Sequence, residues 1–66
     1  MRLDKAKLAY ELARRDMRQK HLSERSGVSR GTVSAIACGK TVALDTAQRI
    51  ATALDVSLHD LIEKGA

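Results

Sequence analysis

The sequence predicts an all-α fold of five short helices, compact and confined to one domain. Apolar residues recur at spacings of three and four along the chain, which is the period of an α-helix. Proline, phenylalanine and tryptophan are absent, and runs of the β-branched residues that favour strands are scarce. A chain of 66 residues buries only about 60% of the surface that it exposes when unfolded, so its core is thin. We therefore expect residues 1–66 to form a single domain that a second subunit would stabilise.

The first two helices are expected over about residues 4–15 and residues 19–26. Asp4 is placed to cap the first helix, which has leucines four residues apart on its buried stripe. Gly27 follows the second helix, where glycine adopts a left-handed conformation without steric cost. The second helix is therefore expected to end there.

The third helix is expected to begin after Ser29, a residue that caps helices well, and to end at Gly39. Val33 and Ile36, three residues apart, form its buried edge. Only two residues separate Gly27 from this helix, so the second and third helices cannot lie antiparallel along their full lengths. We expect them to cross steeply, as in a helix-turn-helix.

The fourth helix is expected over about residues 44–54, where the apolar spacing is the most regular in the chain. Asp55 follows it and tolerates the left-handed conformation that a turn requires there better than most residues do. The fifth helix is expected to start at Ser57 and to end at Gly65.

The charge of the chain is distributed unevenly. Twelve basic and eight acidic residues give a net charge of +4. Residues 1–40 contain ten of the basic and four of the acidic residues, a net of +6, whereas residues 41–66 have a net of −2. This asymmetry suggests a polyanionic partner for one part of the chain. On composition alone, a solvated basic surface on an ordinary small protein explains the asymmetry equally well.

Several classes of protein are excluded or disfavoured. No apolar stretch approaches the roughly 20 residues that a transmembrane helix needs, and no signal peptide is evident. Cys38 is the only cysteine, so no internal disulfide forms, and one aromatic residue cannot build a platform for single-stranded nucleic acid. His21 and His59 have no partners at metal-binding spacing. We predict no enzyme activity, metal, cofactor, small-molecule ligand or membrane partner.

The most informative motif spans residues 19–40. A glutamine opens the second helix, a leucine and a small residue follow, and a glycine-apolar-serine turn leads to a helix that a glycine-lysine pair ends. These residues are Gln19, Leu22, Ser23, Gly27, Val28, Ser29, Val33, Ile36, Gly39 and Lys40. In this order they resemble the helix-turn-helix of the phage repressor and Cro family, also called the XRE family. The resemblance continues through the fourth helix and implies a compact five-helix lambda-repressor-like domain, with the helix-turn-helix over about residues 18–38.

The resemblance also implies residue roles. Bases would be read from one arc of the third helix: Arg30, Gly31, Ser34 and Ala35. The DNA backbone would be contacted from both ends of the motif: Arg18, Gln19, Lys20, Ser29, Thr32 and Lys40. A guanidinium matches the major-groove acceptors of guanine, which makes Arg30 the strongest candidate, with a phosphate contact or a solvated charge as alternatives. Ser29 is expected to cap the third helix, and a phosphate contact can coexist with that role.

Three positions depart from the family pattern. Arg18 stands where a capping serine or threonine is usual, so the second helix is expected to start less firmly unless Asp16 helps. Ala37 replaces an acidic residue that often pairs with an arginine of the first helix. Ala43 replaces a common capping serine, which leaves the start of the fourth helix open.

The implied function is a sequence-specific regulator of transcription, a repressor that binds double-stranded DNA with its third helix in the major groove. We expect a homodimer on a pseudo-palindromic operator, in the cytoplasm of a bacterial cell or a phage-infected host. Its predicted dimer surface consists of four apolar residues near the C-terminus: Val56, Leu58, Leu61 and Ile62. The alternative is that these residues close the monomer core, with Leu58 and Leu61 facing inward. Two other functions stay open, an antitoxin-type interaction module that also binds DNA, and the DNA-binding fragment of a longer repressor.

Overall fold

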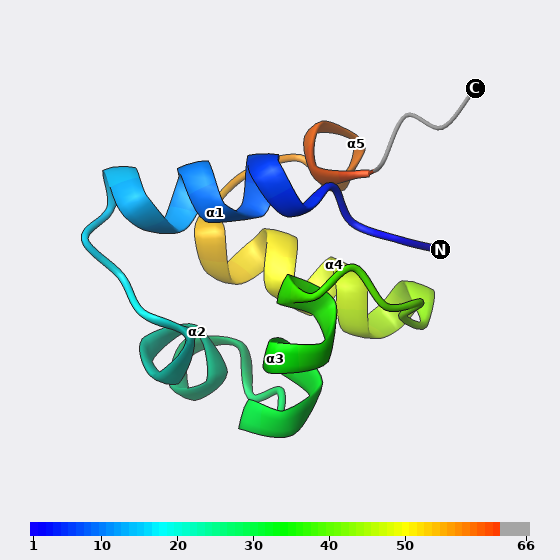
Figure 1. Ribbon diagram of the computed structural model, residues 1–66, viewed down its shortest axis with the longest axis horizontal. Coiled ribbons are helices and arrows are strands. Elements are labelled where there is room, and N and C mark those ends of the chain that lie inside the picture. The colour runs from blue at the N-terminus through cyan, green and yellow to red at the C-terminus, as the bar shows by residue number, and fades with distance from the viewer. Residues whose placement is uncertain (63–66) are drawn as a thin grey trace.

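A computed structural model describes residues 1–62 of the chain and contains five helices in this part (Figure 1). The helices are α1 (Lys5–Arg14), α2 (Gln19–Ser26), α3 (Arg30–Ala37), α4 (Leu44–Leu54) and α5 (Leu58–Leu61). Among the described residues no β-strand occurs, and the only pairing of strand type is an isolated bridge. The predicted all-α fold is therefore confirmed. No helix within residues 1–62 is long and apolar enough to cross a membrane.

Local sequence signals set most helix ends. The carboxylate of Asp4 caps α1 by accepting hydrogen bonds from the backbone N–H groups of Ala6 and Lys7, at 2.9 and 3.2 Å. Gly27 and Asp55 follow α2 and α4 with φ angles of 73° and 56°, the left-handed conformation expected for both. The helix α4 begins where its apolar spacing predicts, although its N-cap residue is an alanine and makes no side-chain hydrogen bond.

The end of α5 differs from the prediction. Ser57 caps this helix as expected, but the helix ends at Leu61 and does not continue to Gly65, which lies outside the described residues. Ile62 is extended and forms an antiparallel bridge with Leu3, and the carbonyl of Leu61 accepts a hydrogen bond of 2.7 Å from the backbone N–H of Asp4. The physical reason is tertiary, because the N-terminal segment pairs with the backbone that would have extended the helix.

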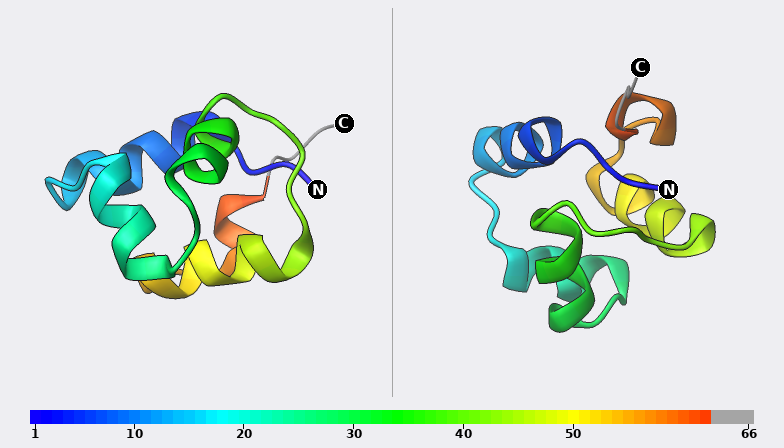
Figure 2. Two further views of the ribbon diagram at one scale, coloured as in Figure 1. Left: turned by 90° about the horizontal axis from the view of Figure 1, so that it is seen from below. Right: turned by 45° about the vertical axis from the view of Figure 1, so that its right-hand side comes forward.

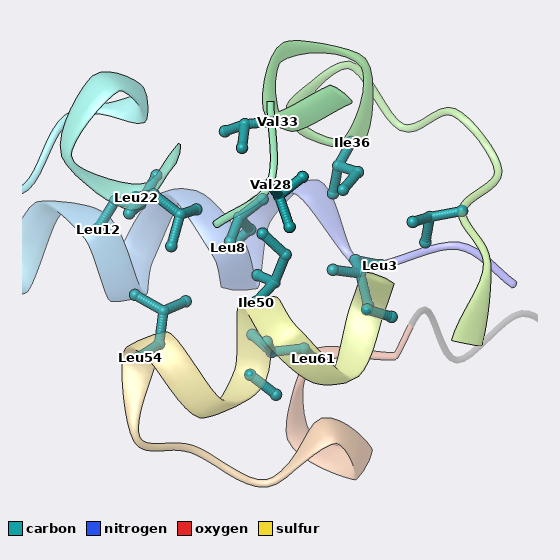
Figure 3. Packing of buried hydrophobic residues seen from close by; sticks show 13 residues of the cluster. Leu3, Leu8, Leu12, Leu22, Val28, Val33, Ile36, Ile50, Leu54 and Leu61 are labelled. Carbon is teal, nitrogen blue, oxygen red and sulfur yellow. The ribbon is translucent and has the colours of Figure 1, made fainter. Parts of the chain in front are cut away.

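The hydrophobic core gathers side chains from every helix around α4 (Figure 3). The helix α4 contributes four residues that are at most 1% exposed, which explains why it has the most regular apolar spacing in the chain. Fully burying one valine, leucine or isoleucine side chain contributes about 1.5–3 kcal/mol. The core consists of Leu3, Leu8, Leu12, Leu22, Val28, Val33, Ile36, Val42, Ala47, Ile50, Ala51, Leu54 and Leu61.

The arginine at the end of α1 makes contacts that the sequence did not suggest. Arg15 donates one hydrogen bond of 2.6 Å to the carbonyl oxygen of Leu54 and another to the carboxylate of Glu11 on its own helix. On α3, Ala37 is half-buried and offers this arginine no acidic partner. The arginine thus pairs within α1 and ties that helix to the end of α4.

Candidate nucleic-acid interface

The turn between α2 and α3 is held by side-chain hydrogen bonds. The hydroxyl of Ser23 donates to the carbonyl oxygen of Val28 at 2.6 Å, and the hydroxyl of Ser26 donates to that of Leu22 at 2.7 Å. Ser26 also accepts from the backbone N–H of Val28 at 3.2 Å. Since the side chain of Val28 is only 7% exposed, the turn is anchored to the core as well. These contacts fix the steep crossing of the two helices that Figure 2 shows.

One side of α3 is buried and its start is capped. Val33 is fully buried and Ile36 is 2% exposed, as their spacing predicts. The hydroxyl of Ser29 accepts a hydrogen bond of 3.3 Å from the backbone N–H of Thr32 and donates one of 2.9 Å to its hydroxyl. The expected cap at Ser29 is therefore present, and it orients the half-buried side chain of Thr32.

The opposite side of α3 faces solvent. Arg30, Gly31 and Ser34 are exposed and Ala35 is half-buried. At 3.6 residues per turn these four positions span an arc of about 140° that lies away from the buried edge. An α-helix with its side chains is about 10–12 Å across, which fits the major groove of B-DNA, about 12 Å wide. The structure thus brings the four predicted base-reading residues onto one accessible surface.

The start of α2 lacks the usual side-chain cap. Arg18 has an extended conformation at the N-cap, and a guanidinium has no acceptor to offer. Instead, Nδ1 of His21 accepts a hydrogen bond of 3.3 Å from the backbone N–H of Arg18, which is half of a capping box. Asp16 does not take this role, since the N-cap is Arg18 and no side chain caps the start of α2 from that turn.

The N-terminal end of α2 is exposed, and its N-cap side chain makes no hydrogen bond to the helix backbone. A helix start attracts anions through these groups and through its dipole. Arg18, Gln19 and Lys20 all have exposed side chains at this end. Sequence analysis missed the contribution of His21, although a residue three positions after an N-cap is where a capping box supplies its acceptor.

At the other end of the motif, the turn after α3 positions Lys40. Gly39 has a φ of 89°, and its N–H donates to the carbonyl of Ile36 at 3.0 Å. The backbone N–H of Lys40 donates to the carbonyl of Ala35 at 3.0 Å, while its side chain is exposed. Cys38 is the C-cap of α3 and its thiol is free and exposed.

The electrostatics of the motif favour an anion. Residues 18–40 contain five basic residues and one acidic residue, Glu24. Both ion pairs within residues 1–62 involve Glu11 of α1, which pairs with Arg14 and Arg15. The basic groups of the motif therefore form no ion pair with the described part of the chain.

No group of histidine, cysteine, aspartate and glutamate side chains in the described part of the chain could hold a metal ion.

Comparison with known proteins agrees with this geometry. The family model described as "Cro/C1-type HTH DNA-binding domain" matches residues 7–64. The matched span contains α2, α3 and the turn with Lys40, as well as α4 and α5. No curated protein and no solved structure is similar enough to add to this match.

Proposed function

Because the chain belongs to the Cro/C1-type helix-turn-helix family of DNA-binding domains, we propose that it is a sequence-specific regulator of transcription that acts as a repressor. The observation that supports this most is α3, which has one side in the core and the other exposed, as a helix that enters the major groove requires. The regulator works in the cytoplasm of a bacterial cell or a phage-infected host. Residues 1–66 form one domain, with the helix-turn-helix over about residues 18–38.

The base-reading residues are the four on the exposed arc of α3: Arg30, Gly31, Ser34 and Ala35. Arg30 lies at the N-terminal end of the helix, where its guanidinium reaches the two major-groove acceptors of a guanine. Gly31 lets the helix backbone approach the base edges, and Ala35 offers a methyl group to a thymine. Most of the sequence preference therefore comes from Arg30.

Contacts with the DNA backbone set the register of α3 in the groove. They come from exposed or helix-end groups on both sides of the arc: Arg18, Gln19, Lys20, Ser29, Thr32 and Lys40. The hydroxyl of Ser29 is already used in the cap of α3, so its phosphate contact would come through its remaining acceptor capacity. Such contacts give affinity and salt dependence and no sequence preference.

The operator is pseudo-palindromic and the protein binds it as a homodimer. A single module buries only roughly 600–1,000 Å² on DNA, and a dimer with α3 helices about 34 Å apart doubles that contact. Leu61 is 1% exposed and belongs to the core of the described chain, so we leave it out of the proposed dimer surface. The proposed dimer surface is therefore formed by the half-buried residues Val56, Leu58 and Ile62.

Selection of bound sequences from random duplexes tests the function directly. We expect a two-fold symmetric consensus with half-sites about 10 base pairs apart, together with a mass of two chains per operator in sedimentation. A consensus without symmetry would contradict the homodimer and leave DNA recognition intact. Absence of any enrichment would contradict sequence-specific regulation and favour a protein-interaction module of the antitoxin type.

A further inference from the structure

We propose that Arg2 and Lys5, which lie outside the helix-turn-helix, join Lys40 in a second phosphate-binding patch at the C-terminal end of α3. We call these three residues the N-terminal patch. The inference rests on the proposed function, because its ligand is the backbone of the same duplex that α3 enters. It adds two residues from the start of the chain to a site otherwise built from α2, α3 and the turn that follows.

The side chain of Lys5 lies across the turn that positions Lys40. If Gly39 had a Cβ atom, that atom would lie 3.0 Å from Cδ of Lys5, 3.3 Å from Cγ and 3.5 Å from Cε. The methylene stem of Lys5 therefore runs directly over Gly39, and the ammonium group is attached to Cε, at the end of this stem. Lys5 and Lys40 are thus on adjoining parts of one exposed surface, although they are 35 positions apart in the sequence.

Arg2 is brought to the same end of the molecule by backbone pairing. The backbone N–H of Val42 donates to the carbonyl of Met1 at 2.7 Å, and the nitrogen of Met1 donates to the carbonyl of Val42 at 3.1 Å. Leu3, which follows, is 1% exposed and packs in the core. Because successive side chains of an extended segment point to opposite sides, Arg2 faces outward, and it is exposed. The N-terminal segment runs beside the α3–α4 loop in both views of Figure 2.

The structure shows no stabilising role for these positive charges within residues 1–62. The first turn of α1 contains no acidic residue, and the helix dipole disfavours the cation of Lys5 at that end. Neither Arg2 nor Lys5 forms an ion pair with any residue in the range 1–62. The neighbouring carboxylate of Asp4 is engaged as the N-cap of α1. The charges therefore remain available to an external anion.

The patch is separate from the phosphate contacts proposed at the start of α2. The N-terminal end of α2 and the N-terminal patch lie at different ends of the helix-turn-helix. With α3 in the groove, the two groups would therefore meet phosphates at separate places on the duplex backbone. Residues 1–5 thus take part in DNA binding and do not serve only to complete the core.

Salt titration of DNA binding tests the patch. The probe is a duplex of about 20 base pairs of mixed sequence, bound at a series of KCl concentrations and followed by fluorescence anisotropy. Each lost phosphate contact reduces the slope of log K against log salt concentration by about 0.9. We expect this reduction in Lys5→Met, which keeps the stem over Gly39, and in Arg2→Gln. If the variant and the wild-type protein bind the duplex equally well at 1 M KCl, this change in slope makes the variant bind about eightfold more weakly at 0.1 M KCl.

Lys7→Met is the matched control. It removes the same charge from the same helix, and its position is about 200° around α1 from that of Lys5. Lys5→Arg should restore the slope of the wild-type protein, which a purely structural role of Lys5 would not require. If the wild-type protein binds the duplex but Lys5→Met and Lys7→Met have equal salt slopes, the patch is overturned. The proposed function is then unaffected. A wild-type protein that binds no duplex at any salt concentration would overturn both.

Discussion

The guanidinium of Arg15 donates a hydrogen bond of 2.6 Å to the carbonyl oxygen of Leu54, and this contact joins the C-terminal ends of α1 and α4. The two residues are 39 positions apart in the chain. The carbonyl groups in the last turn of a helix have no partner within the helix, and a cation near them also interacts favourably with the helix dipole. Arg15 therefore links the first helix to the helix at the centre of the core.

Removal of this link should destabilise the protein. A hydrogen bond to a charged group contributes about 1.5–3 kcal/mol, so Arg15→Ala should lower the free energy of unfolding by about that amount. Urea denaturation followed by circular dichroism measures it, with an unchanged m value showing that the folded state stays compact. Arg14→Ala is the control, because Arg14 pairs with the same Glu11 and is more exposed than Arg15. Equal destabilisation by the two variants would contradict the role of the Leu54 contact.

The pairing of Glu11 predicts a pH dependence of stability. Hydrogen bonds from Arg14 and then from Arg15 lower the pKa of Glu11 below its ordinary value of 4.5. A lowered pKa in the folded state means that the stabilisation is present above about pH 4.5 and is lost as the pH falls through the folded-state pKa. Glu11→Gln should therefore be less stable than the wild type at pH 7, and the difference should shrink below pH 4.5. Thermal melts at pH 7, 5, 4 and 3 measure this, and a difference that stays constant would exclude the ion pair as its cause.

Much of the fold was predictable from the sequence because its signals are local. The caps at Asp4 and Ser29 and the left-handed residues Gly27 and Asp55 depend on neighbours within a few positions. The end of α5 was predicted wrongly, because it is decided by pairing between Leu61–Ile62 and the N-terminal segment, which no local pattern reveals.

The candidate site also has parts that the sequence predicts and parts that only the structure reveals. The exposed arc of α3 follows from helical spacing, once Val33 and Ile36 are recognised as its buried edge. The stem of Lys5 over Gly39 depends on how α1 meets the α3–α4 loop, and the cap from His21 depends on the orientation of its ring. Contacts between distant segments were therefore the part that needed the structure.

Gly31 should separate the requirements of folding from those of DNA binding. A Cβ atom at this position would meet no atom within 4 Å, and the residue is helical without a positive φ. Gly31→Ala should therefore stabilise the protein by roughly 0.5–1 kcal/mol. It should also weaken binding to the selected operator, because we propose that the backbone of α3 approaches the bases at this position. Gly27→Ala is the contrasting variant, because a φ of 73° makes alanine strained there and should lower the melting temperature. Unchanged operator affinity in Gly31→Ala would show that DNA does not approach this part of the helix closely.

Arg30 should account for most of the sequence preference. Its side chain is exposed at the N-terminal end of the arc, and a good bidentate contact with guanine contributes about 1–3 kcal/mol of discrimination. Arg30→Ala should therefore weaken binding to the selected operator by that amount and affect a scrambled duplex much less.

Gln19→Ala and Lys40→Ala should weaken binding to both duplexes alike, because phosphate contacts have no sequence preference. Titrations of the three variants against both duplexes at one salt concentration measure the ratios. Equal losses on the two duplexes in Arg30→Ala would assign Arg30 to the DNA backbone and move base reading to Ser34 and Ala35.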